Sequence, residues 1–183
     1  FGIVAFRDNT SVAPGVEYVS KVILAPAKGA KPADLEAALA GLGAATASTQ
    51  TFNEDGMAGM ETALGLANWD DFGGRFVIYI SDAGARSGED PLGATRKNPA
   101  EINALARERG IATLVLHLKT DAGKAYHHLA EQQYQALAAW PGIQPLYFPI
   151  ENGAFAAFGK AVDDPTNQIV SIINTSIGGG LGD

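Results

Sequence analysis

The 183-residue chain has no cysteine, relatively few basic residues and no long apolar run, and each of these features excludes a class of function. Without cysteine there are no disulfides, thiolate nucleophiles or cysteine zinc sites. No apolar stretch approaches the roughly 20 residues that span a bilayer. No basic segment followed by an apolar core opens the chain, as it would in a targeting peptide. These absences leave a folded domain that works through its side chains or its surface.

Basic residues are also scarce, because 13 Lys and Arg stand against 20 Asp and Glu, for a net charge of −7. Nucleic acids and anionic membranes both require basic surfaces. We therefore expect no nucleic-acid partner and no membrane contact by this domain itself. Hydrophobic residues make up 46% of the chain, which is enough for the core of one domain. Because Phe1 already lies in an apolar run, we expect the chain to be part of a longer polypeptide.

The order of apolar and amphipathic segments predicts an α/β fold. Strands are predicted at 1–6, 16–24, 76–80, 111–118 and 143–150, and helices at 32–42, 54–67, 98–110, 122–140 and 164–177. The first connection is short and rich in turn formers, so the first two strands should pair antiparallel at a sheet edge. Later strands alternate with helices, which predicts a doubly wound, mostly parallel sheet. We expect one domain over 1–177 and a flexible tail over 178–183.

The segment Phe76-Val-Ile-Tyr-Ile-Ser-Asp82-Ala-Gly84 is the strongest functional signal. Its apolar run is typical of a strand buried on both faces in a parallel sheet. Ligands of open α/β sheets bind at the carboxyl ends of the strands, where Asp82 would lie. The alternative is that Asp82 only stabilises the turn, which is common for Asp and Gly after a strand.

Several segments together resemble the von Willebrand factor A domain. They are the strand Phe1-Gly-Ile-Val-Ala-Phe-Arg-Asp8 with its antiparallel partner ending at Leu24, and the strand that ends in Ile-Ser-Asp82-Ala-Gly84. The block from His117 to His127, with the later Glu131-Gln-Gln-Tyr134 and Trp140-Pro-Gly142, is similar to the C-terminal A domain of PpkA-type threonine kinases of bacterial type VI secretion systems. The resemblance covers nearly the whole chain.

The resemblance implies a metal-ion-dependent adhesion site at the carboxyl ends of the strands. Its third element matches Asp82, and Thr51 is the nearest candidate for its second, with Ser48 and Thr49 as weaker substitutes in the same loop. The Asp-x-Ser-x-Ser motif of the first element is absent, since Asp8-Asn-Thr-Ser-Val12 ends in valine and precedes no predicted helix. The resemblance therefore implies a partial or degenerate Mg²⁺ or Mn²⁺ site made of Asp82 and Thr51. Thr51 could instead cap the helix predicted from Glu54.

The family's central first strand is also missing from this sequence, where it would precede Phe1. The resemblance implies that this strand lies between the strands 1–6 and 76–80. We therefore expect two unpaired edges and possible self-association through the gap, since open edges recruit other chains.

The resemblance implies a protein-interaction module with a protein partner and no catalytic residues, in a parent protein that carries its kinase domain elsewhere. It places the module on the periplasmic side of a membrane-anchored bacterial protein; without the PpkA-type resemblance, a cytoplasmic place is expected. Two alternatives remain open. One is a metal-dependent hydrolase or phosphatase that uses Asp82, and the other is a structural A-type domain without metal.

Overall fold

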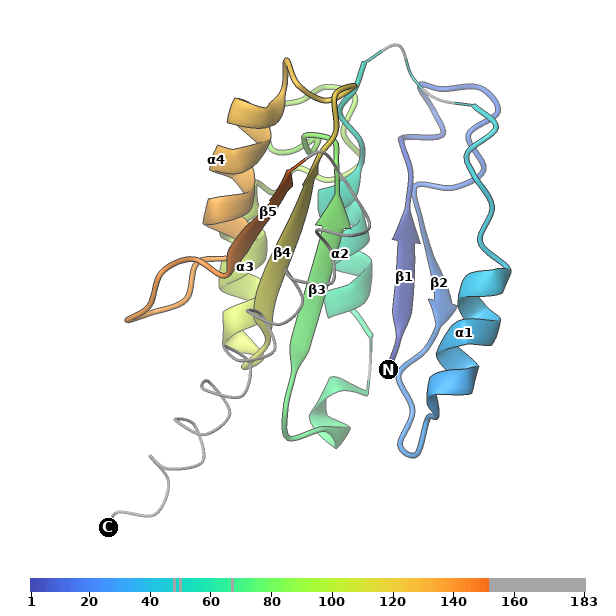
Figure 1. Cartoon of the computed structure of the whole chain (residues 1–183), viewed down its shortest axis with the longest axis vertical. Coiled ribbons are helices and arrows are strands. Elements are labelled where there is room, and N and C mark those ends of the chain that lie inside the picture. The colour runs from blue at the N-terminus through green and yellow to red at the C-terminus, as the bar shows by residue number, and fades with distance from the viewer. Residues whose placement is uncertain (48, 50, 67, 152–183) are drawn as a thin grey trace.

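The computed structural model describes residues 1–47, 49, 51–66 and 68–151 (Figure 1). The described elements are β1 (Ile3–Phe6), β2 (Ser20–Leu24), α1 (Pro32–Ala40), α2 (Gly56–Leu64), a 3-10 turn (Trp69–Asp71), β3 (Phe76–Ser81), α3 (Pro99–Glu108), β4 (Ala112–Lys119), α4 (His127–Leu137) and β5 (Tyr147–Glu151). The helix predicted at 164–177, the tail predicted at 178–183 and the candidate Ser48 lie outside the described residues. None of the described helices has the length and apolar character needed to cross a membrane.

The strands form one antiparallel and one parallel sheet. β1 pairs with β2 antiparallel, with Val4 opposite Val22, as predicted for the first two strands. β3, β4 and β5 form a parallel sheet in that order, with Ile78 opposite Leu114. The fold is thus mixed α/β, as the sequence predicts, and β5 lies at one end of the described parallel sheet.

β1 and β3 lie side by side and run in the same direction, but no ladder of hydrogen bonds joins them (Figure 1). Side chains make the contact instead. The rings of Phe6 and Tyr79 are stacked, with their centroids 5.3 Å apart and their planes 3° apart. Helix α2 contacts β1, β2 and β3, and so spans both sheets on one face.

Two glycines allow α2 to approach both strands. A Cβ on Gly59 would lie 2.8 Å from Phe6 Cβ, and a Cβ on Gly56 would overlap the hydroxyl of Tyr79. Carbon atoms in contact normally stand about 3.5–4.0 Å apart. Any larger side chain at these two positions would therefore push the helix away from the strands.

The main core lies between the parallel sheet and the layer formed by α2, α3 and α4. Met57, Ile102 and Tyr134 supply one fully buried side chain from each helix. The prediction that strand 76–80 is buried on both faces is wrong, because Ile78 is 53% and Ile80 43% exposed. The three helices cover one face of the parallel sheet, with α2 against β3 and with α3 and α4 against β4, and β3 lies at one end of this sheet.

Helix boundaries agree with the sequence where the capping is local. Asn98 accepts a hydrogen bond from the Glu101 N–H at 3.0 Å, while the Glu101 carboxylate accepts one from the Asn98 N–H at 2.7 Å. This reciprocal cap begins α3 at Pro99, as predicted. By contrast, α1 buries none of its residues, and Leu39 of its predicted apolar face is 48% exposed.

The cap predicted at Thr51 is wrong. Helix α2 begins at Gly56 rather than at Glu54, and its N-cap residue is Asp55. The Glu54 N–H, which Thr51 was expected to bind, donates instead to the carbonyl of Gly84 at 3.0 Å. A backbone partner from a distant loop has replaced the local side chain.

Candidate functional site

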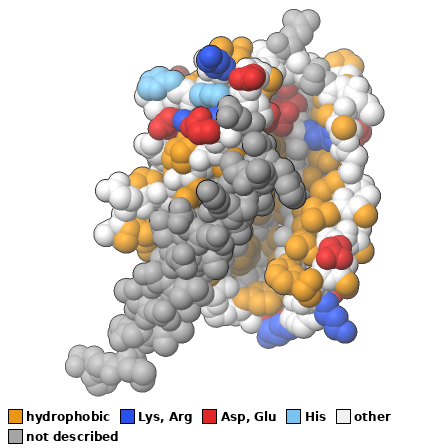
Figure 2. All heavy atoms as spheres, viewed as in Figure 1, with side chains coloured by type: hydrophobic (Ala, Val, Ile, Leu, Met, Phe, Trp, Pro, Cys, Tyr) orange, Lys and Arg blue, Asp and Glu red, His pale blue; other side chains and the backbone are white. Residues whose placement is uncertain are grey.

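Four segments meet at the carboxyl ends of β3 and β4, and we call this region the crest. It comprises residues 8–9, 49 with 51–55, 82–95 and 120–123. Figure 2 shows acidic side chains and histidines gathered at the same end of the molecule. Ligand sites of α/β sheets lie at this end.

Glu54 and Asp55 join the two sheets at the crest. Glu54 bridges to Ala85 in parallel fashion, and its carbonyl accepts a hydrogen bond from the Arg86 N–H at 2.8 Å. The Asp55 N–H donates to the carbonyl of Arg7, just after β1, at 2.8 Å. A two-residue segment thereby closes the crest end of the gap between β1 and β3.

The fully buried side chain of Arg86 lies beside this bridge, with only 1% of its surface exposed. Its Nε and Nη2 donate to the two carboxylate oxygens of Asp8 at 2.5 and 2.9 Å. Nη2 also donates to Thr51 Oγ1 at 2.7 Å and Thr49 Oγ1 at 3.0 Å, and Nη1 to Asp90 Oδ2 at 3.2 Å. One guanidinium therefore holds Asp8 in the segment after β1, the two threonines before α2 and the loop after β3.

The charges in this cluster are matched. Burial of Asp8 favours its neutral form, but hydrogen bonds from Arg86 and Thr49 outweigh that effect and hold its pKa below the ordinary value. The hydrogen bonds to Asp8 raise the pKa of Arg86. A buried pair of this kind is strongly destabilised when one partner is removed, since the other charge is left without compensation.

Asp82 directly follows β3, which ends at Ser81, and so lies at the carboxyl end of that strand. Its Oδ2 accepts a hydrogen bond from Thr120 Oγ1 at 3.3 Å, in the loop after β4. A Cβ on Gly123 would lie 2.8 Å from the Asp82 carbonyl oxygen and 2.9 Å from the Phe52 ring, so this loop packs tightly against Asp82.

The rest of the loop after Asp82 is clamped by α4. Gln133 accepts a hydrogen bond from the Ala85 N–H at 2.9 Å and donates to the Ala85 carbonyl at 2.8 Å. The hydroxyl of Tyr134 donates to the carbonyl of Ala83. The backbone that carries Asp82 and Arg86 is therefore rigidly placed.

The predicted metal ligands have different partners. Thr51 contacts Arg86, whereas Asp82 contacts Thr120. Within the described ranges, no three His, Asp or Glu side chains converge where they could hold a metal ion. A cation bound to Thr51 Oγ1 at about 2.0–2.6 Å would lie within roughly 5 Å of the guanidinium, where like charges repel. The hydroxyl oxygen of Thr51, which accepts a hydrogen bond from Arg86, therefore fits a guanidinium better than a divalent metal ion.

The pKa values of Glu54 and Asp55, the two acidic residues of the bridge, are both raised by their surroundings. Burial, with the charges of Asp82 and Asp8, raises the pKa of Glu54. Burial also raises the pKa of Asp55, although its carboxylate accepts a hydrogen bond from the Ala94 N–H at 3.0 Å. The crest thus concentrates negative charge around one buried cation.

His117 lies at the carboxyl end of β4 and is fully buried. Its Nδ1 forms a hydrogen bond of 2.8 Å with the Tyr147 hydroxyl, and its ring meets that of His127 edge-on, with centroids 5.4 Å apart. Burial, together with the nearby His127 and Lys119, lowers its pKa to about 4. The sequence predicts a partly buried histidine whose hydrogen bonds are all made. In the structure the side chain is completely buried, and among the described residues Nδ1 has a hydrogen-bond partner whereas Nε2 has none.

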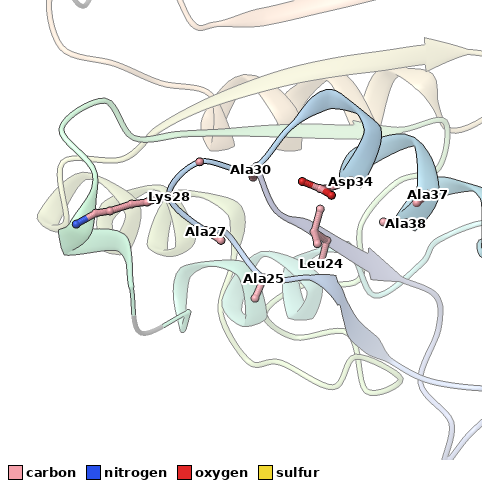
Figure 3. Close-up of a pocket in the computed structure, with 9 residues that line it drawn as sticks. Leu24, Ala25, Ala27, Lys28, Ala30, Asp34, Ala37 and Ala38 are labelled. Carbon is pink, nitrogen blue, oxygen red and sulfur yellow. The ribbon is translucent and has the colours of Figure 1, made fainter.

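A shallow hollow lies at the far end of the molecule from the crest, between the end of β2 and α1 (Figure 3). Leu24 and Asp34 lie over this space, whereas Lys28 points away from it. Alanines supply most of its lining. Asp34 already accepts a hydrogen bond from the Lys31 N–H at 2.8 Å. The hollow therefore offers no set of groups for chemistry.

No family model matches this sequence, and a search of curated proteins finds no match. The functional argument therefore rests on the crest itself.

Sequence reasoning missed Asp8 and Arg86. The only signal for Arg86 was a basic residue four positions before Asp90 and four after Asp82. That spacing is ordinary on exposed loops, where such pairs contribute little.

Proposed function

We propose that this chain is a von Willebrand factor A-type interaction module with a degenerate metal site, from a protein similar to the PpkA-type threonine kinases of type VI secretion. The proposal places it on the periplasmic side of a membrane-anchored bacterial parent and assigns it a protein partner. In this view the two sheets are parts of one sheet, mostly parallel with β2 as its antiparallel edge strand.

One observation carries the proposal. β1 and β3 run in the same direction, lie side by side and share no ladder, while Glu54 and Asp55 together bridge the segments that follow them. This is the arrangement expected when a central strand is absent from a single sheet. A strand entering the gap could form hydrogen bonds with both open edges, which is a common mode of peptide recognition.

The test combines sedimentation velocity over a range of concentrations with hydrogen exchange of the β1 and β3 amides. We expect either concentration-dependent association with slowed exchange in Ile3–Phe6 and Phe76–Ser81, or a monomer in which the gap-facing amides exchange rapidly. A monomer in which both strands are fully protected would refute the proposal, because the edges would then need no further strand.

A second experiment tests whether Asp82 belongs to a degenerate metal site or to an enzyme. We expect Asp82→Asn to leave association unchanged and the purified chain to lack phosphatase activity. Turnover of a phosphomonoester that Asp82→Asn abolishes would favour the metal-dependent hydrolase instead.

A further inference from the structure

We propose that Arg86 serves as the permanent cation of the crest and takes the structural role that a divalent metal would have in a complete adhesion site. This inference rests on the proposed function for the comparison with a metal site. The geometry of Arg86 does not depend on it.

The first argument is the identity of the atoms around Arg86. Five oxygen atoms accept its hydrogen bonds, and all are carboxylate or hydroxyl oxygens: Asp8 Oδ1, Asp8 Oδ2, Asp90 Oδ2, Thr49 Oγ1 and Thr51 Oγ1. Hard divalent cations choose such oxygens. A guanidinium offers five N–H donors in a fixed plane. Here Nε and Nη1 each donate to one oxygen, and the two N–H groups of Nη2 serve three oxygens, so one of them is shared.

The second argument is the number of segments that converge on it. Asp8 follows β1, the threonines belong to the loop before α2, and Asp90 belongs to the loop after β3. β1 and β3 have no shared ladder, so this cluster connects elements that the backbone leaves unpaired. Arg86 is a positioning residue, since it holds the loops that carry Asp82 and Thr51.

The third argument is burial. Arg86 is 1% and Asp8 4% exposed, so the pair is largely removed from water. The two hydrogen bonds between them are parallel and bidentate, which is the strongest arrangement for this ion pair. An arginine in this setting cannot leave readily to admit a metal ion.

The test begins with the wild-type chain, stripped of metal and then titrated with Mg²⁺ or Mn²⁺ while its thermal unfolding is followed. We expect no shift in Tm. A saturable rise in Tm with Mn²⁺ that Asp82→Asn abolishes would overturn the inference, because the crest would then use a metal after all. This first arm needs no variant at Arg86, so it decides the question even if such variants fold poorly.

The second arm removes the guanidinium. Arg86→Ala should lower Tm by roughly 6–20 °C, from the cost of breaking a buried pair in a chain of this size. It exposes Asp8, Asp90 and both threonines, so millimolar Mn²⁺ should now raise Tm. Arg86→Lys keeps the charge and should respond to neither ion. Arg96→Ala, which removes an arginine that donates to the Asp90 carbonyl, is the matched control and should change Tm little.

A stable Arg86→Ala protein with wild-type Tm would also overturn the inference. The outcomes are separable from those of the proposed function. A metal response in the wild type leaves the interaction module intact, whereas a monomer with protected edges refutes the missing strand without affecting the role of Arg86.

Discussion

The close approach of α2 to β1 gives the sharpest stability prediction, at Gly59. Replacement of a glycine by alanine inside a helix normally stabilises it by about 1 kcal/mol. Here the added Cβ would lie 2.8 Å from Phe6 Cβ and 3.0 Å from Phe6 Cδ1. Phe6 Cβ is the fixed base of its side chain, and its ring is stacked on Tyr79, so it cannot rotate away.

The magnitude follows from these opposed effects. Overpacking of a core typically costs about 1–3 kcal/mol, which exceeds the gain in helix propensity. Subtracting the gain of about 1 kcal/mol from this cost, we expect Gly59→Ala to lower the free energy of unfolding by up to about 2 kcal/mol, or Tm by up to roughly 8 °C. Urea denaturation followed by circular dichroism measures the first, and thermal scans measure the second.

The control is Gly41→Ala at the end of α1. A Cβ there meets only the Ala38 carbonyl at an ordinary 3.6 Å, and the backbone φ of −85° suits any residue. This variant should be neutral or slightly stabilised. If the free energy of unfolding of Gly59→Ala equalled that of Gly41→Ala, the close contact between α2 and β1 would not exist in solution. The argument that α2 joins the two sheets would then fail.

Two further predictions concern buried polar groups. The pKa of His117 is lowered to about 4, so this side chain is neutral in the folded state near pH 7. Its contribution to the free energy of unfolding should be complete above about pH 6.5, the ordinary pKa of histidine. That contribution should be lost as the pH falls toward 4, at up to about 1.4 kcal/mol per pH unit. Urea titrations between pH 7 and 4.5 should show a shallower loss in His117→Gln than in the control His128→Gln, and equal slopes would contradict the burial of His117. Asn103 donates to the carbonyls of Leu137 at 2.8 Å and Ala139 at 2.9 Å, at the end of α4. Asn103→Ala should therefore cost about 1–3 kcal/mol in urea unfolding, and a cost below a few tenths would mean that water replaces these bonds.

The sequence predicts most strands and helices, because their signals are local. The cap of α3 depends on Asn98 and Glu101, three residues apart, and it forms as predicted. The apolar run from Phe76 to Ile80 specifies a strand in a parallel sheet, though not which of its faces is covered.

The crest was harder to predict because its partners are distant in the chain. Thr51 loses its expected role as a cap when Gly84, more than thirty residues away, binds the Glu54 N–H. Arg86 and Asp8 are separated by 78 positions, and nothing in either neighbourhood marks them as a buried pair. Residues such as Asp82, which follow a strand directly, are predictable in position but not in partner.

The absence of a ladder between β1 and β3 also bears on how the molecule opens. A three-stranded sheet with its helices can remain folded while the β1–β2 pair and the exposed helix α1 detach together. Among the residues that the structure describes, side chains and the Glu54–Asp55 bridge hold these elements to the rest. Such sub-global opening requires less free energy than complete unfolding. Proteases should therefore cleave first near α1, leaving a resistant fragment that begins close to α2.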